Sequence, residues 1–429
     1  MLLLLALLIT PALGANHAVL IAGSNGWYNY RHQADIAHAY KSLTEANVPA
    51  DNIITFMYDD IAQNPSNPHP GKLFNHPDTA DRVATDVYAP IKGKIDYTGK
   101  DVNPANFLAV LQGKATNAGT GRTLTSTSAD HVFVYFADHG GRGILGMPSG
   151  QKFLQADDLN AALEQASSSG LFKQLVFYVE ACESGSIFDG LLKAKNVYVV
   201  TAANDTESSW GWYCGGMSSQ SGSNVVQGKS LGVCLGDEFS VRFMENTDAD
   251  KKLDETLKKQ FSAVKAAVTK SHPQQFGTTA FLSEPIADFM GSGKARNASS
   301  LYVPEPRSAF GIDSRDIRVR YLQWKLRTAK TDLERAAAQS ALSAELQSRD
   351  RADALFSRVW MRVTGEKDAS GMLEYRPPRN FGCMRRALEA VYALGGTSDY
   401  SLKYVATISL MCELGHGGDF IANAIEAEA

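Results

Sequence analysis

The chain has 429 residues, of which 44% are hydrophobic and 21% charged, and its formal net charge is −4 at pH 7. This composition is typical of a globular protein with a sizeable core, and the length favours two structural units over one. Because the sequence contains no basic stripe, we expect no nucleic-acid partner.

The chain begins with a hydrophobic run that predicts a signal peptide over residues 1–15. Ala12 and Gly14 supply the small residues that a cleavage site needs. The run is shorter than the roughly 20 residues that cross a bilayer, and no later segment is apolar for that long, so we expect no membrane span. Sequons at Asn204 and Asn297 agree with a secretory route.

Short runs of apolar and β-branched residues alternate with helical patterns from residue 16 to about residue 290. The runs are apolar throughout, as in strands that are covered on both faces. Their order predicts an α/β fold with a largely parallel sheet flanked by helices. The predicted strands are residues 18–22, 53–57, 131–136, 175–179 and 197–201, and the predicted helices are residues 33–46, 103–111 and 155–167.

The composition changes after residue 290. Residues 291–320 carry Gly, Pro and scattered charges and are predicted to form a linker. Residues 321–429 are predicted to form a separate all-α unit, because a long helical pattern covers residues 318–363 and shorter ones cover 383–394 and 401–414. The catalytic part, residues 16–290, is acidic, whereas the tail is basic.

Two residues with catalytic chemistry follow two strands of the predicted sheet: His139 after residues 131–136, and Cys182 after residues 175–179. Parallel strands end at one edge of a sheet, so these side chains can converge there. An imidazole beside a thiol raises the thiolate fraction and later protonates the leaving amine. The N–H groups of Gly140 and Cys182 are candidates to stabilise the oxyanion. The pair predicts a cysteine endopeptidase, although either residue alone is more often structural.

Five cysteines are present and none belongs to a CxxC pair, so we expect no structural zinc, no other metal and no cofactor. Cys214 and Cys234 bracket a Gly/Ser-rich stretch, and Cys383 and Cys412 both lie in the tail. Two local disulfides would leave Cys182 as the free thiol. The alternative is that Cys182 is buried and inert, as lone thiols usually are.

The sequence also resembles the legumain family of asparaginyl endopeptidases over nearly the whole mature chain. The similarity rests on long motifs in the same order, including Phe-Ala-Asp-His-Gly at 136–140 and Phe-Tyr-Val-Glu-Ala-Cys-Glu-Ser-Gly at 177–185. The other matching segments are residues 23–35, 58–61, 96–99, 106–110, 202–204, 207–209 and 235–237. The resemblance implies a caspase-like fold, with cleavage after Asn and, at lower pH, after protonated Asp.

The resemblance assigns catalytic roles to residues of this chain. It implies that Cys182 is the nucleophile and His139 the acid/base. Asn29 would orient the His139 ring, and Asp138 matches an aspartate that can form a succinimide in this family.

The resemblance also implies a substrate pocket. An Asn amide offers an oxygen to a guanidinium and two N–H groups to carboxylates, so a pocket with both kinds of group would suit it. From residue types alone, the same residues would form a surface ion-pair group. The implied pocket residues are Arg31, Glu180, Ser208 and Asp237.

We expect a zymogen of the secretory pathway, in a lysosome or vacuole or secreted. The resemblance makes the tail an inhibitory prodomain, and acid would loosen it by neutralising carboxylates at the interface. The linker would then be cut at Asn297 or Asp313, which both suit the implied specificity. The expected partners are protein and peptide substrates, the protein's own tail and a second copy of the proenzyme.

Two alternatives stay open. A peptide ligase, in which an amine resolves the acyl-enzyme, would use the same Cys182 and His139, and an inactive homologue would only bind or store. A lipid-anchor transamidase is disfavoured because it normally has a membrane segment and no helical prodomain. A metacaspase is disfavoured because its preference for basic residues would not need Arg31.

Overall fold

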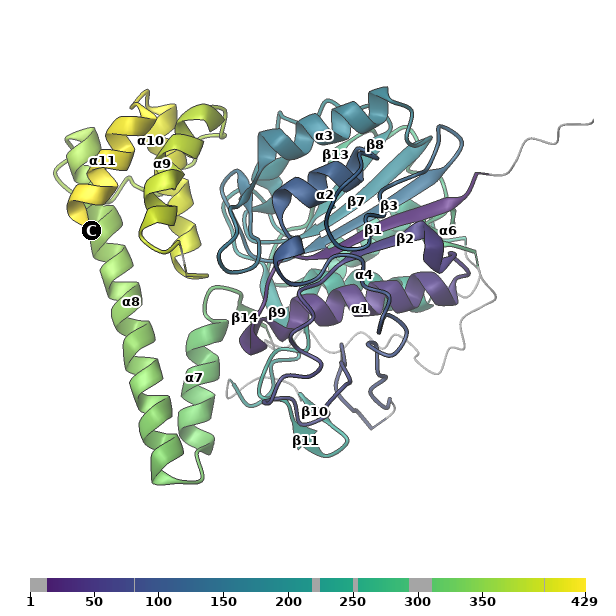
Figure 1. The fold of residues 1–429 in the computed structure, drawn as a ribbon, viewed down its shortest axis with the longest axis horizontal. Coiled ribbons are helices and arrows are strands. Elements are labelled where there is room, and N and C mark those ends of the chain that lie inside the picture. The colour runs from purple at the N-terminus through teal and green to yellow at the C-terminus, as the bar shows by residue number, and fades with distance from the viewer. Residues whose placement is uncertain (1–13, 81, 218–223, 250–253, 293–310, 397) are drawn as a thin grey trace, which may run out of the picture.

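The computed structural model describes residues 14–80, 82–217, 224–249, 254–292, 311–396 and 398–429. The predicted signal peptide, apart from its last residues, lies outside the described residues, as do Asn297 and most of the predicted linker. Figure 1 shows an α/β unit built around one sheet and a helical unit at one side of it.

A six-stranded sheet forms the centre of the α/β unit, in the order β13-β8-β7-β3-β1-β2. Five strands of this sheet, β1, β2, β3, β7 and β8, run parallel to one another, and only β13 runs antiparallel, beside β8. The strands are β1 (Asn16–Ala22), β2 (Ile53–Phe56), β3 (His131–Ala137), β7 (Gln174–Glu180), β8 (Val197–Thr201) and β13 (Gln274–Gly277).

Alternate residues of each strand pack into two different helical layers. In β3, Val132, Val134 and Phe136 belong to one buried cluster, and Phe133 and Tyr135 belong to the other. Both faces of the sheet are therefore apolar, which explains the continuous hydrophobic runs in the sequence. One layer contains α2 (Pro104–Leu111) and α3 (Ala156–Ser168), and the other contains α1 (Tyr30–Glu45), α4 (Glu238–Ala249), α5 (Leu257–Ala267) and the short α6 (Ala287–Met290).

Short strands form three small sheets outside the central one. One of them joins the two units, because its strands β9 and β12 belong to the α/β unit whereas β14 lies in the predicted linker, just before the tail helices. The small sheets contain β4 (Gly140–Gly141), β5 (Ile144–Leu145) and β6 (Leu154–Gln155); β9 (Trp210–Trp212), β12 (Gly236–Asp237) and β14 (Ile312–Asp313); and β10 (Val225–Val226) and β11 (Lys229–Ser230).

The tail is helical, and its long helical pattern divides into two helices. The chain turns at residues 329–331, so that α7 (Ile317–Thr328) and α8 (Asp332–Thr364) form a hairpin (Figure 1). Thr331 and Glu334 cap the start of α8 reciprocally, each side chain bonding the backbone N–H of the other. The remaining helices are α9 (Phe381–Ala393), α10 (Val405–Glu413) and α11 (Gly418–Glu428). No helix of the described residues has the length and apolarity needed to cross a membrane.

Both expected disulfides, Cys214–Cys234 and Cys383–Cys412, are present, and Cys182 is free. The first disulfide closes a loop that receives α7: Ile317, Tyr321 and Trp324 pack against it. A side chain at Gly232 would collide with the Trp324 indole, and the φ of 68° at Gly232 also favours glycine.

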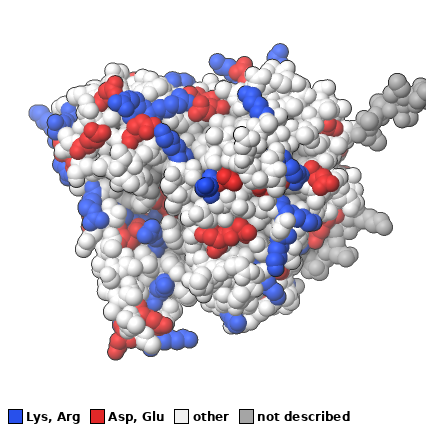
Figure 2. Space-filling model, in the orientation of Figure 1, with Lys and Arg blue, Asp and Glu red and all other residues white. Residues whose placement is uncertain are grey.

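Exposed ion pairs also join the units. Arg385 lies 2.7 Å from Asp157 and 2.8 Å from Asp158, and Lys152 lies 2.5 Å from Glu389. Figure 2 shows positive and negative side chains interspersed over the face that it presents. Since exposed pairs contribute little individually, the buried contacts of α7 are the stronger link between the units.

The predicted α/β fold with a largely parallel sheet and a helical tail is confirmed, and the predicted strands and helices of the front lie within a few residues of those observed. Sequence patterns missed β13, whose Gln and Gly residues are atypical of strands. They also missed the turn before Thr331, because Ala, Lys and Thr interrupt a helical pattern only weakly, and α11, which follows a pair of glycines.

Candidate active site

The side chains of His139 and Cys182 come from the ends of adjacent strands. β3 and β7 are paired in register, with Ala137 opposite Glu180, and the Asp138 N–H donates to the Glu180 carbonyl over 3.0 Å. Both residues therefore follow the sheet by two positions, as expected. Gly140 passes so close to the Cys182 carbonyl oxygen that any side chain there would collide with it.

Cys182 is buried, with 1% of its surface exposed. Its sulfur accepts a hydrogen bond from the Ser209 N–H at 3.3 Å and lies 3.7 Å from the Ser209 hydroxyl. Burial raises the pKa of the Cys182 thiol, and Arg315 opposes this shift. In this state the thiol is therefore protonated at neutral pH.

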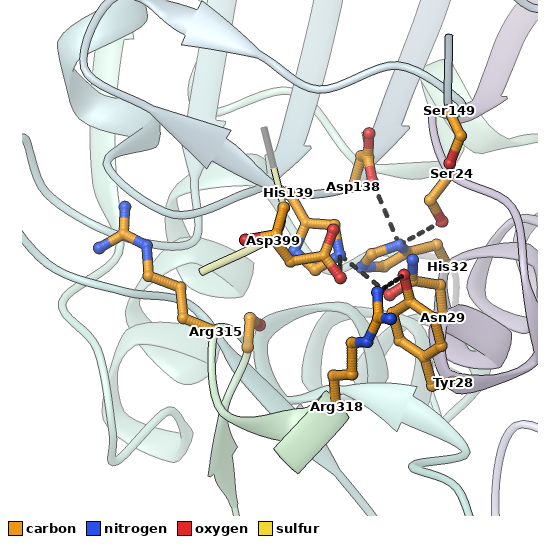
Figure 3. A network of polar contacts seen from close by, with 12 residues as sticks. Ser24, Tyr28, Asn29, His32, Asp138, His139, Ser149, Arg315, Arg318 and Asp399 are labelled. Carbon is orange, nitrogen blue, oxygen red and sulfur yellow. Dashed lines mark hydrogen bonds and ion pairs between the residues drawn. The ribbon is translucent and has the colours of Figure 1, made fainter. Parts of the chain in front are cut away.

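Within the described structure, the His139 ring is hydrogen-bonded through only one of its two nitrogens. Its Nε2 lies 2.9 Å from the Asn29 Oδ1, which can only accept, so Nε2 carries the proton (Figure 3). Its Nδ1 is buried and has no hydrogen-bond partner among the described residues. Burial lowers the pKa of His139 to about 4, although Asp399 opposes this shift. The neutral ring thus has one nitrogen free to accept a proton.

Asp138 and His32 lie behind His139. The His32 Nδ1 is 3.3 Å from Asp138 and 2.6 Å from the Ser24 hydroxyl, and its ring stands edge-on to His139 with centroids 5.0 Å apart (Figure 3). Burial raises the pKa of Asp138 well above its usual range. A neutral Asp138 carboxyl can remain in this apolar setting without a charge partner.

The same three residues are the only group of potential metal ligands that the described part of the chain brings together. The ligand atoms of His32, Asp138 and His139 lie within 4.8 Å of one another. The positive charge of Arg31 acts on both His139 and Asp138 and disfavours a cation there. The site is better explained as a positioned histidine than as a metal centre.

A second buried cluster contains three of the expected pocket residues. The Arg31 Nε donates to Asp237 over 2.8 Å, and Glu180 accepts from the Ser240 N–H and hydroxyl over 2.9 and 2.8 Å. Ser208 is half-buried, lies next to Ser209, and takes no part in these contacts. At most 1% of the surface of Arg31, Glu180 or Asp237 is exposed.

Each of these three side chains keeps one polar atom without a hydrogen-bond partner in the described structure. The atoms are the Arg31 Nη2, which is a donor, and the Glu180 Oε1 and Asp237 Oδ2, which are acceptors. The Asp237 Oδ2 does lie 3.5 Å from the His32 Nε2. Since buried polar atoms are normally satisfied, one unsatisfied donor and two unsatisfied acceptors in the same cluster are compatible with a ligand that supplies the missing bonds.

Asp35 is a third buried carboxyl of this cluster, which sequence patterns did not single out. It accepts a hydrogen bond from the Asp237 N–H at 3.2 Å and one from the Asn75 amide at 2.6 Å. Burial raises the pKa of Asp35 and Glu180 well above their usual range, and the nearby Asp237 adds to both shifts. Burial also raises the pKa of Asp237, while Arg31 opposes it.

The last part of the predicted linker crosses this site. β14 pairs antiparallel with β9, and the Ser314 N–H donates to the Ser209 carbonyl over 3.1 Å. Arg315 then reaches Glu183, 3.0 Å away. Asp313, a predicted cleavage site, lies in β14 and accepts from the Arg315 N–H over 2.9 Å. The Ser314 hydroxyl lies 3.4 Å from the Ser209 hydroxyl, which in turn lies 3.7 Å from the Cys182 sulfur.

The helical unit contributes Asp399, whose carboxylate lies 3.4 Å from the His139 Nε2, and Arg318, whose guanidinium lies 5.1 Å from the centre of the Tyr28 ring (Figure 3). A cavity of about 440 Å³ beside His139 is lined by residues of both units, including Lys152 and Tyr392. Asp399 and Arg315 were not predicted, because no local pattern links a tail residue to a strand end far away in the sequence.

The sequence comparisons with known proteins all point to one family of peptidases. A model of the Peptidase C13 family matches residues 16–292. A vacuolar-processing enzyme of Citrus sinensis is 36% identical over 96% of this chain and 84% of its own length, and the delta-isozyme of Arabidopsis thaliana is 36% identical over 97% and 90%. Legumain of Canavalia ensiformis is 43% identical over 63% of this chain and 54% of its own.

One solved structure, caspase-1 of Spodoptera frugiperda, aligns over 66% of this chain and 92% of its own, with 11% identity and a TM-score of 0.35. That similarity is too low to define the fold, which the strand order establishes directly.

Proposed function

Because the chain belongs to the Peptidase C13 family and is a legumain-type cysteine peptidase, we propose that it cleaves peptide bonds after Asn, with Cys182 as nucleophile and His139 as acid/base. The names of its relatives suggest a vacuolar location, and we extend that location to this protein.

One observation carries the specificity: the three orphaned atoms of Arg31, Glu180 and Asp237 complement a primary amide. The Asn oxygen would accept from the Arg31 Nη2, and its two N–H bonds would point to the Glu180 Oε1 and Asp237 Oδ2. An ionised Asp would offer no donor and would add a negative charge beside the two acids. Asp should therefore bind only when it is protonated, at lower pH.

The proposed reaction begins with transfer of the Cys182 thiol proton to the His139 Nδ1. The sulfur attacks the substrate carbonyl, and the N–H groups of Gly140 and Cys182 stabilise the oxyanion. His139 then protonates the leaving amine, and water hydrolyses the thioester with His139 as base. Asn29 keeps the ring oriented by accepting from its Nε2.

We also propose that the tail inhibits the enzyme until acid releases it. β14 pairs with β9, and the Ser314 hydroxyl lies 3.4 Å from that of Ser209, which borders the Cys182 sulfur, so this segment would block a substrate. The contacts Arg315–Glu183, Arg385–Asp157 and Arg385–Asp158, which join the tail to the α/β unit, all need ionised carboxylates. Protonation of these carboxylates removes the charge attraction and favours release, after which Asn297 or Asp313 would be cut.

A peptide-library digest tests the specificity. The full chain is first allowed to process itself in acid, and the library is then digested near pH 5. We expect cleavage concentrated after Asn, and none with Cys182→Ser. Cleavage concentrated after any other residue would reject the pocket assignment, and activity in Cys182→Ser would reject the nucleophile.

A further inference from the structure

Arg142 is a buried cation beside the site that the proposed reaction does not use. It follows β4, and only 2% of its surface is exposed. The next residue, Gly143, donates its N–H to the Ser186 hydroxyl over 3.0 Å, and that hydroxyl donates to the Glu183 carbonyl over 2.6 Å. Arg142 therefore belongs to the wall that continues from Cys182 through Glu183.

The tail shows in which direction a bound chain runs. Ile312 and Asp313 pair with β9, Ser314 lies beside Ser209, and Arg315 reaches Glu183. A substrate paired with β9 in the same way would pass Cys182 and leave along Glu183. Arg142 thus lies on the side where the residues after the cleaved bond bind.

Arg142 is already bound to a peptide in this structure. Its Nη1 donates to the Glu374 carbonyl over 2.7 Å, and its Nη2 donates to the Leu373 carbonyl over 3.2 Å. The guanidinium also lies 5.0 Å from the centre of the Tyr375 ring. These residues belong to the tail, so its release would uncover the surface that they occupy beside Arg142.

The contacts indicate what this surface selects. The Arg142 guanidinium donates to two successive backbone carbonyls, and such contacts can hold any extended peptide. Its contact with the Tyr375 ring depends on the side chain, because a cation is attracted to the face of an aromatic ring. Tyr375 also lies near Asp205, so the site next to Arg142 accepts an aromatic ring that carries a hydroxyl group.

We propose that Arg142 is a specificity-determining residue for the leaving side of the substrate, where it favours an aromatic residue at the second or third position after the cleaved bond. This inference rests on the proposed endopeptidase function and adds a preference for certain residues after the cleaved bond.

The test uses full chains that have processed themselves in acid. Peptides with a common Asn carry Tyr, Phe, Ala or Lys at the second or third following position and compete in one digest, with ratios of kcat/KM measured by mass spectrometry. Since a cation beside a ring gives a modest gain, we expect about a fivefold preference for Tyr or Phe over Ala. Arg142→Gln should reduce this ratio to below about twofold, and Arg142→Lys should restore it only partly, because Lys lacks the planar fork.

Lys41→Gln is the matched control, because Lys41 is a cation of the α/β unit outside this site whose partner is Glu45 in the same helix. It should keep the full preference. An unchanged ratio in Arg142→Gln, or no aromatic preference in the parent protein, would overturn the inference. Cleavage after a residue other than Asn, with the Arg142-dependent ratio intact, would instead reject the proposed Asn specificity and leave the role of Arg142 standing.

Discussion

The carboxylate of Asp399, in the helical unit, lies 3.4 Å from the Nε2 of His139, in the α/β unit. The tail thus touches the ring through the same nitrogen that bonds Asn29. Asp399 raises the pKa of His139 against the larger lowering by burial. The tail therefore acts on the charge state of His139 as well as covering the site.

Asp399→Asn should weaken the attachment of the tail to the α/β unit. Without the carboxylate the attraction to His139 is lost when acid protonates the ring, so the tail should leave several times faster, as expected for the loss of about 1 kcal/mol. The half-time with which added active enzyme cuts the tail from the Cys182→Ala chain after an acid jump, followed by gel electrophoresis, checks this. Asp419→Asn, which removes an exposed pair with Arg386 inside the tail, should behave like the parent.

Ser314→Asn should convert the inhibitory segment into a substrate. The Ser314 hydroxyl lies 3.4 Å from that of Ser209, which borders the Cys182 sulfur, and Asn at this position would offer the amide that the orphaned atoms require. We expect a new cut after residue 314 and faster activation, both visible by mass spectrometry. Asp313→Asn is the control, and cutting after 313 instead of 314 would show that the register along β9 is different.

Arg31→Lys should reduce cleavage after Asn severely. Lysine keeps the charge but cannot bond Asp237 through Nε while it presents Nη2 to the substrate. An unsatisfied buried partner costs about 3 kcal/mol, so kcat/KM should fall about 100-fold. Arg122→Lys, which alters a half-exposed arginine paired with Asp96, should change kcat/KM little. A comparable loss in both variants would point to misfolding.

Asp35→Asn should flatten the dependence of stability on pH. Because burial raises the pKa of Asp35, the folded state holds this proton more tightly than the unfolded state. The stabilisation is complete below the unfolded pKa of about 4 and is lost as pH rises through the folded pKa. The Tm of the Cys182→Ala chain should fall from pH 4 upward, and less so with Asp35→Asn. The exposed Asp51→Asn should follow the parent, and an identical fall in all three would contradict this assignment.

The sequence predicted those parts of the site that follow from strand order. His139 and Cys182 stand at strand ends, and the register of β3 with β7 brings those ends together. Arg31, Glu180 and Asp237 followed from family resemblance, and the structure brings them together as a buried cluster.

The contacts made by the tail could not be predicted in the same way. Asp399 and Arg142 acquire their partners through the docking of two units, and no periodicity or spacing in the chain encodes how the two units dock. Asp35 was hidden for a different reason: a carboxyl in a helix is normally read as exposed, and only its burial against Asp237 shows its role.

β14 lies on the tail side of residues 293–310, so a cut before residue 311 leaves it attached to α7 and the other tail helices. Such a cut turns an intramolecular complex into one between two chains. The effective concentration of the tail, set at first by its tether, then becomes its real concentration. Activity after cleavage should therefore follow mass action: a dilute sample gains activity, whereas a concentrated one stays latent until acid separates the chains.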